Sequence, residues 1–170
     1  MLSKAGSRAF AVYVNKASEV EIVLDTDQLL LWRKGYWSIY ALSKARHGTV
    51  VLVAEDKTDL EALRKGAVGG RDPLSRALTS HVRGTKIGTL KRSGELNRIL
   101  SSDGMTVINR KGEFLDTGLI IDTSQVSDLV TGGGRTIAAI AASHFGWIVK
   151  VSEDGPVELF HNGRRIYRFG

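Results

Sequence analysis

The stretch Thr49-Val50-Val51-Leu52-Val53-Ala54 decides the fold, because it is a continuous apolar run of the length of one β-strand. A strand that is apolar on both faces lies inside a sheet that helices cover from both sides. With 170 residues the chain is long enough for one domain with a core and short for two. We therefore expect a single α/β domain over residues 1–170, in which a twisted mixed β-sheet is surrounded by helices.

The sequence before this strand predicts a helix over residues 28–47, where apolar residues recur every three to four positions. Gly35 lies inside that pattern and is expected to weaken or kink the helix, because glycine is a poor helix former. Gly48 suits the position that follows a helix end. Two further strands are expected upstream, at residues 10–14 and 20–24.

After the central strand, helix and strand patterns continue to alternate, and hairpin turns are concentrated late in the chain. Because hairpins join antiparallel strands, the sheet should be mixed rather than purely parallel. The expected helices are a short one around Leu60 and Leu63, one over 73–82, one ending at Leu100 and one over 136–143. The expected strands are 105–108, 113–121, 147–151, 157–161 and 164–169.

The composition favours an anionic partner, because 24 Lys and Arg residues face 18 Asp and Glu residues, for a formal net charge of +6. The basic residues are scattered, which is also typical of an ordinary solvated surface. The absence of cysteine excludes disulfides and thiolate metal sites. No apolar run has the length of a membrane span or of a secretory signal, so we expect a cytoplasmic protein. Whether the domain belongs to a larger protein stays open.

A glycine cluster, Gly132-Gly133-Gly134, runs into Arg135, Thr136 and an alanine-rich helical pattern. Such a loop can bring backbone N–H groups and a helix N-terminus up to a phosphate. A glycine cluster before a helix is also typical of a plain turn. Phosphate binding by this loop is therefore a hypothesis that needs support from other segments.

Five segments in order resemble the diadenylate cyclase domain, over residues 31–168. No single motif carries the resemblance, which depends on their order and spacing. The segments are Trp32-Arg33-Lys34-Gly35 through the strand at 49–53; Gly69-Gly70; Leu96 to Leu100 with Ser102-Asp103-Gly104-Met105; the glycine–arginine loop; and Val149-Lys150-Val151-Ser152-Glu153-Asp154-Gly155.

The resemblance implies an adenine-nucleotide site, because this family makes cyclic di-AMP from two ATP molecules held by two domains face to face. Asp103 matches the acidic residue of the Asp-Gly-Ala motif, which implies metal binding and activation of the 3′-hydroxyl. Gly104 would let the backbone approach the nucleotide. Met105 stands where the family has alanine and is expected beside the nucleotide. A face-to-face homo-oligomer is implied if the chain is a cyclase.

The glycine–arginine loop is the most altered motif in this comparison. Gly133, Gly134 and Arg135 match the family's Gly-Thr-Arg, while Thr136 stands at its histidine and Ile137 at its second arginine. A two-residue insertion would instead align Arg135 with that second arginine. In either register a basic cluster has become one arginine, and losing such donors can slow phosphoryl transfer by thousands-fold.

The turn Ser152-Glu153-Asp154 matches the family's Ser-Glu-Glu, with aspartate in place of the last glutamate. The resemblance implies that Ser152 and Glu153 contact the nucleotide. Asp154, together with Asp103, would hold Mg²⁺ or Mn²⁺ in the presence of bound nucleotide. Without the resemblance, the same residues are typical of a solvated turn.

Three hypotheses of function follow. The chain is a diadenylate cyclase of atypical or reduced activity, or a nucleotide-sensing domain of the same fold without catalysis. A third reading is a basic nucleic-acid-binding module that uses Arg164, Arg165 and Arg168.

Overall fold

The computed structural model describes residues 26–55, 60–65, 73–90, 92–123 and 133–169. Helices alternate with strands along the chain, as the sequence predicts. In order, the elements are α1 (Thr26–Lys44), β1 (Thr49–Ala54), α2 (Leu60–Lys65), α3 (Pro73–Val82), the 3₁₀ turn η1 (Ile87–Thr89), α4 (Ser93–Leu100), β2 (Met105–Asn109), β3 (Phe114–Leu119), α5 (Gly134–Ala142), the 3₁₀ turn η3 (Ser143–Phe145), β4 (Gly146–Val151), β5 (Val157–His161) and β6 (Arg164–Phe169).

The strands form one six-stranded sheet in the order β3-β2-β1-β4-β5-β6. β1 pairs in parallel with β2 and antiparallel with β4, and the outer pairs are antiparallel. β1 therefore lies inside the sheet, and all six of its residues are buried. The predicted single-domain α/β fold with a mixed sheet is confirmed.

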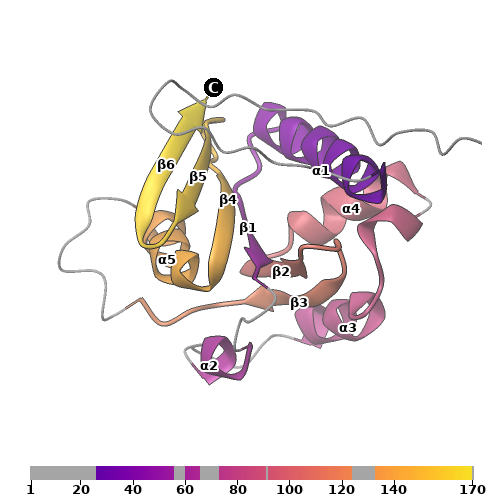
Figure 1. Cartoon of the computed structure of the whole chain (residues 1–170), viewed down its shortest axis with the longest axis horizontal. Helices are drawn as coiled ribbons and strands as arrows, with labels where there is room; N and C mark the ends of the chain where they lie inside the picture. The colour runs from indigo at the N-terminus through magenta and orange to yellow at the C-terminus, as the bar shows by residue number, and fades with distance from the viewer. Residues whose placement is uncertain (1–25, 56–59, 66–72, 91, 124–132, 170) are drawn as a thin grey trace, which may run out of the picture.

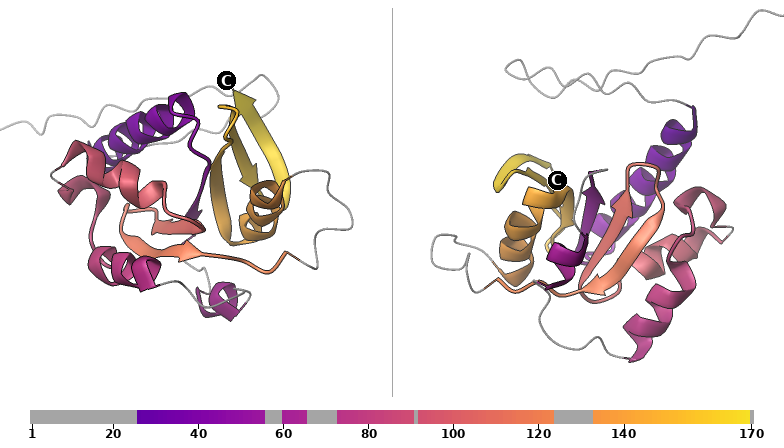
Figure 2. Two further views of the ribbon diagram at one scale, coloured as in Figure 1. Left: turned by 180° about the vertical axis from the view of Figure 1, so that it is seen from behind. Right: turned by 60° about the horizontal axis from the view of Figure 1, so that its bottom comes forward.

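Helices cover both faces of the sheet, as Figures 1 and 2 show. Alternate residues of β1 point to opposite faces, which divides the core in two. Val50, Leu52 and Ala54 belong to the cluster beneath α5 and α2. Val51 and Val53 belong to the cluster beneath α1, α3 and α4. This explains why residues 50–54 are all apolar, whereas the buried Thr49 donates its hydroxyl to the carbonyl of Leu100.

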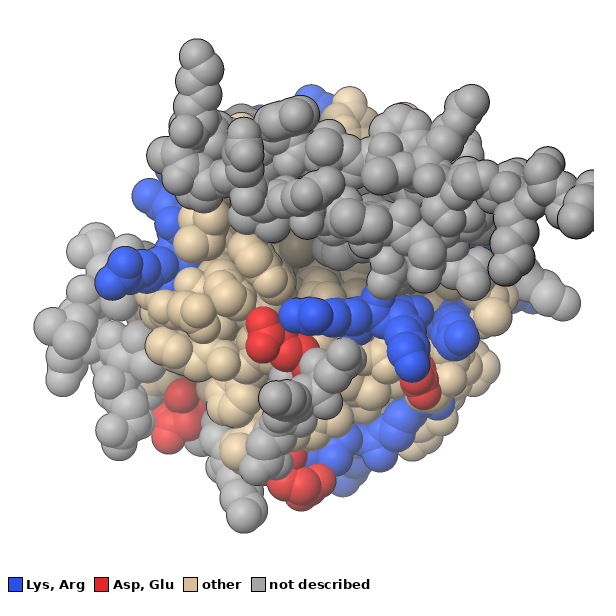
Figure 3. Space-filling model, viewed as in Figure 1, with Lys and Arg blue, Asp and Glu red and all other residues tan. Residues whose placement is uncertain are grey.

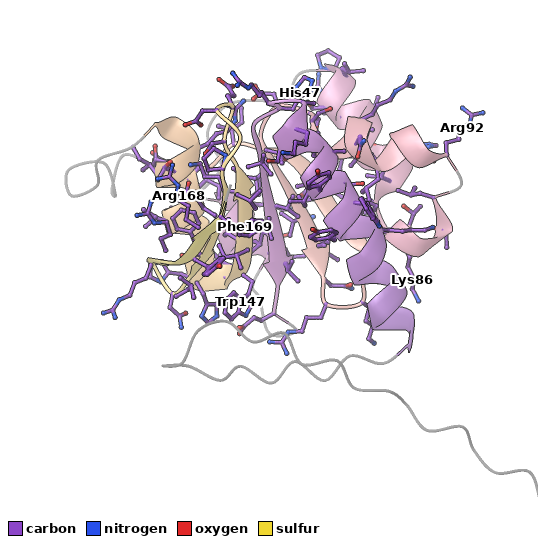
Figure 4. The ribbon with its side chains drawn as sticks, turned by 90° about the horizontal axis from the view of Figure 1, so that it is seen from above. His47, Lys86, Arg92, Trp147, Arg168 and Phe169 are labelled. Atoms are coloured by element: carbon purple, nitrogen blue, oxygen red, sulfur yellow. The ribbon has the colours of Figure 1, made fainter. Side chains whose placement is uncertain are left out.

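Helix α1 differs from its prediction at two points. It runs unbroken through Gly35. It ends at Lys44 rather than at residue 47, and Arg46 adopts a left-handed conformation with φ of 56°. The His47 N–H then bonds the carbonyl of Leu42 at 2.9 Å, and Figure 4 shows His47 where the chain turns toward β1. The helix ends there because Leu42 is its last buried apolar residue.

The remaining helices and strands lie within two residues of their predicted positions, and β5 and β6 coincide with them. The strands predicted at 10–14 and 20–24 lie outside the described residues. Strand β6 lies at the edge of the sheet, and all six of its residues are exposed. Among the helices that the structure describes, none combines the length and the apolar character needed to cross a bilayer.

Candidate functional site

The strand register brings the start of β1, Asp103 and the turn at 152–154 to one end of the sheet. Val50 lies opposite Met105 on β2 and opposite Lys150 on β4. The residues just before β2 and just after β4 therefore flank the start of β1. Since neighbouring strands are about 4.8 Å apart, these two segments lie roughly 10 Å from each other. Asp103 and the turn at 152–154 thus share the end of the sheet at which β1 begins.

A hollow of about 270 Å³ lies at this end, between the start of α5 and the turn after β4. It is lined by residues 133–136 of the glycine–arginine loop, by residues 152–154 and by Lys150. The structure thus brings together two predicted segments that are separated by a helix and a strand. The volume is just below the usual range for sites that enclose a whole small molecule, about 300–1,000 Å³.

The start of α5 leaves backbone donors available at the hollow. Gly133 precedes the helix without a side-chain cap, and its carbonyl accepts bonds from the N–H groups of Thr136 and Ile137. The first N–H groups of a helix have no partner inside it and carry a partial positive charge. A Cβ at Gly133 or Gly134 would meet nothing within 4 Å, so the backbone there is open to a ligand. Gly132, the first glycine of the predicted loop, lies outside the described residues.

Arg135 forms an ion pair with Glu153, which lies on the opposite wall of the hollow. Its Nη1 donates to Oε1 of Glu153 at 2.5 Å, and both side chains are largely exposed. The two predicted site residues therefore meet, but their charges cancel. A phosphate group would have to compete with Glu153 for the guanidinium.

Gly48 is a site residue that the sequence analysis interpreted only as a helix end. A Cβ at this position would lie 2.7 Å from Nη1 and 2.9 Å from Cζ of Arg135. The guanidinium therefore lies directly against the backbone of Gly48. The sequence signal was the glycine itself, placed directly before the central strand.

Asp103 and Gly104 form a tight turn before β2. The exposed Asp103 accepts a bond at Oδ1 from the N–H of Gly104, at 3.0 Å. Gly104 has a φ of 81°, and a Cβ there would lie 2.7 Å from the carbonyl carbon of Gly118. Within the described part of the chain, neither residue lines the hollow. The Asp103 carboxylate is exposed at the same end of the sheet as the hollow.

Met105, predicted to lie beside the nucleotide, has its side chain in the core. It is 2% exposed and packs in the cluster beneath α5. The physical reason is strand alternation, since its partner Val50 belongs to the same cluster. Its side chain is therefore packed in the core, and Met105 is not among the described residues that line the hollow.

Lys150 lines the hollow although the sequence analysis assigned it no role. It is 7% exposed, and its Nζ donates to Oε2 of Glu158 at 2.5 Å. Oε1 of Glu158 accepts from Nη1 of Arg165 at 2.8 Å. Burial raises the pKa of Glu158, but the bonds from Lys150 and Arg165 outweigh burial and hold this pKa below its usual value. The sequence signal was a lysine two residues after Ile148, on the core-facing side of β4.

A metal ion would need the ligand's help to bind here. Among the described residues, no group of three or more histidines and carboxylates could hold a metal. Mg²⁺ commonly binds through one or two carboxylates together with phosphate oxygens. Asp103 and Asp154, both exposed at this end of the sheet, fit that pattern only with a phosphate present.

The arginines of β6, to which the sequence analysis assigned a role in nucleic-acid binding, lie on the edge strand of the sheet. Arg164, Arg165 and Arg168 are exposed, and Figure 4 shows Arg168 beside Phe169. Arg165 is paired with Glu158. In Figure 3 the basic and acidic side chains of the described residues are interspersed.

With the geometry in place, the chain can be compared with known proteins. No family model matches it, and no curated protein matches it in sequence. Solved structures do share its architecture, an α/β fold with a mixed six-stranded sheet.

One of these structures is a double mutant of DacA from Staphylococcus aureus, with a TM-score of 0.52 and 19% identity, covering 85% of this chain and 89% of that one. Another is a hypothetical membrane spanning protein from Bacillus cereus, with a TM-score of 0.52 and 21% identity, covering 82% of this chain. This chain spans 63% of the length of the Bacillus protein. At these identities the likeness concerns the fold.

Proposed function

We propose that the chain is an adenine-nucleotide-binding domain of the diadenylate cyclase type. The observation that carries the proposal is the hollow in which the glycine–arginine loop meets the turn at 152–154. Backbone donors at Gly133 and Gly134, the guanidinium of Arg135 and the carboxylate of Asp154 gather there. Donors and a metal-binding carboxylate in one recess are what a polyphosphate requires. DacA, a diadenylate cyclase, has the same fold.

The position of Asp103 supports a role in cyclic di-AMP formation. In that reaction the 3′-oxygen of each ATP forms a bond to the α-phosphorus of the other, and pyrophosphate leaves. Two domains must therefore meet face to face, with the Asp103 ends of their sheets together. Mg²⁺ or Mn²⁺, held by Asp103, Asp154 and the phosphates, would neutralise developing charge. Asp103 would assist removal of the hydroxyl proton.

A second candidate is a nucleotide-sensing domain that binds without catalysis. Two observations favour it: Arg135 is neutralised by Glu153, and Asp103 caps its own turn outside the hollow. Thr136 and Ile137, where the cyclase family has basic residues, add no charge. Transition-state charge would therefore meet few preorganised donors.

One experiment separates the two candidates. The protein at high concentration is incubated with ATP and Mg²⁺ or Mn²⁺, products are separated by chromatography, and ATP binding is measured by calorimetry. A cyclic dinucleotide that the Asp103→Asn variant does not make identifies a cyclase. Binding without product identifies a sensor. Failure to bind any adenine nucleotide overturns both candidates.

A further inference from the structure

Lys150, which lines the hollow, belongs to a continuous series of three charged side chains. Lys150 and Glu158 face each other directly across β4 and β5, and Arg165 reaches the same carboxylate from β6. Lys150 and Glu158 are 7% and 4% exposed. Charges this deeply buried are costly unless they are paired. Here one carboxylate is paired with two cations, which bond its two separate oxygens.

Within this series, Lys150 is the residue that brings a positive charge to the lining of the hollow. The lining residues carry two positive charges, on Arg135 and Lys150, and two negative charges, on Glu153 and Asp154. Arg135 is paired with Glu153, and Arg165 offsets the charge of Glu158. An ammonium group has three donors, and the bond to Glu158 uses one of them. Lys150 is thus a lining residue with both charge and donors to offer an anion.

We propose that Lys150 is the phosphate-binding cation of this hollow, and that Arg165 holds Glu158 while Lys150 donates to the phosphate. Removing one partner of a buried ion pair normally leaves the other charge uncompensated. Arg165 prevents that here, because it bonds Oε1 and leaves Oε2 to Lys150. The ammonium of Lys150 can therefore donate to a ligand while the carboxylate of Glu158 keeps its bond from Arg165.

This inference rests on the proposed nucleotide-binding function and makes it more specific. The loop supplies a single arginine, which Glu153 occupies. Lys150 adds a second cation from the opposite wall. The preferred ligand group is accordingly a chain of phosphates, which spans the hollow between the two cations.

The test compares Lys150→Met with Lys111→Met, which removes an exposed lysine at the far end of the sheet. Binding of ATP, adenosine and inorganic tripolyphosphate is measured by calorimetry at low salt. Losing one charge-assisted bond should weaken ATP and tripolyphosphate about tenfold to hundredfold in Lys150→Met. Adenosine binding should be unchanged, Lys150→Arg should recover most of the loss, and Lys111→Met should behave like the wild type.

A second variant guards against a merely structural effect. Glu158→Gln removes the competing carboxylate, so it should keep or strengthen binding of tripolyphosphate, opposite in direction to Lys150→Met. A structural role alone would make both variants bind more weakly, and that result would overturn the inference. Thermal unfolding of each variant verifies that it is folded.

The remaining outcomes distinguish this inference from the function on which it rests. Equal ATP binding by wild type and Lys150→Met overturns the role of Lys150 and leaves the nucleotide function standing. If tripolyphosphate binding depends on Lys150 and ATP binds no more tightly than tripolyphosphate, the phosphate-binding role of Lys150 is supported. The proposed specificity for adenine is then overturned. A wild-type protein that binds neither ligand overturns both.

Discussion

The guanidinium of Arg135 lies against the backbone of Gly48, so closely that a Cβ at residue 48 would be 2.7 Å from Nη1. Gly48 connects α1 to β1, whereas Arg135 belongs to the first turn of α5. Residues 87 positions apart in the sequence therefore determine together where the positive charge of the loop is held. The absence of a side chain at 48 is what makes this arrangement possible.

We predict that Gly48→Ala displaces Arg135 and weakens ATP binding roughly tenfold, through loss of one charge-assisted contact. The clash is with the end of a flexible side chain, so the free energy of unfolding should change by less than about 1 kcal/mol. Calorimetry and urea unfolding measure the two effects. Gly35→Ala, which meets no atom within 4 Å, is the control and should leave affinity intact. Unchanged ATP affinity in Gly48→Ala would show that this contact does not position Arg135.

Gly104 should tolerate no side chain, because two constraints act on it together. Its φ of 81° disfavours other residues, and a Cβ would lie 2.7 Å from the backbone of Gly118. Gly104→Ala is expected to lower the free energy of unfolding by about 2 kcal/mol or more. Gly94→Ala, with no atom within 4 Å of its Cβ, is the matched control. Equal urea midpoints for the two variants would contradict the prediction.

The stability of the protein should fall in acid partly because of Glu158. The folded state holds the pKa of Glu158 below its usual value, despite the opposing effect of burial. A carboxylate with a lowered pKa contributes stability above its unfolded pKa, about 4.3, and this contribution is lost as pH falls through the folded pKa. Unfolding free energies measured between pH 7 and about 3 should therefore decline less steeply for Glu158→Gln than for the wild type. Parallel curves would exclude this linkage.

An ion pair between Arg64 and the buried carboxylate of Asp116 links helix α2 to the sheet. Asp116 of β3 is 1% exposed and accepts a bond at Oδ2 from Nε of Arg64 at 3.0 Å, with Arg83 at 3.7 Å. Arg64→Met removes the closer cation, so we expect a loss of about 2 kcal/mol, moderated by Arg83. The exposed Arg98 of α4 provides the control substitution Arg98→Met. Thermal and urea unfolding measure the difference, and equal stability of both variants would refute it.

The strands were the most predictable part of the fold. A sheet strand is identified by its own short run of residues, as the apolar run at 49–54 illustrates, and β1 has those bounds. The end of α1 was mispredicted because it depends on tertiary packing: the helix stops after the last residue that the core accepts, Leu42, and not at the nearest glycine.

The candidate site was predictable where a motif is local and not where partners are distant. The loop at 133–136 and the turn at 152–154 were both expected, and the structure brings them together. Lys150 and Gly48 were missed, because their importance comes from Glu158 across the sheet and from Arg135 on another helix. Met105 was expected beside the ligand, but its side chain lies in the core. The expectation came from a motif alignment, which does not show which face of a strand a residue occupies.

The central place of β1 has a consequence for synthesis on the ribosome. Thr49 pairs with Val151, which is translated 102 residues later. At about 5–20 residues per second, the nascent strand is without its β4 partner for roughly 5–20 seconds. During that interval one edge of a strand whose residues 50–54 are all apolar has no neighbouring strand to cover it. The emerging chain should therefore be a chaperone client until β4 leaves the exit tunnel, and truncation before residue 146 should leave an aggregation-prone species.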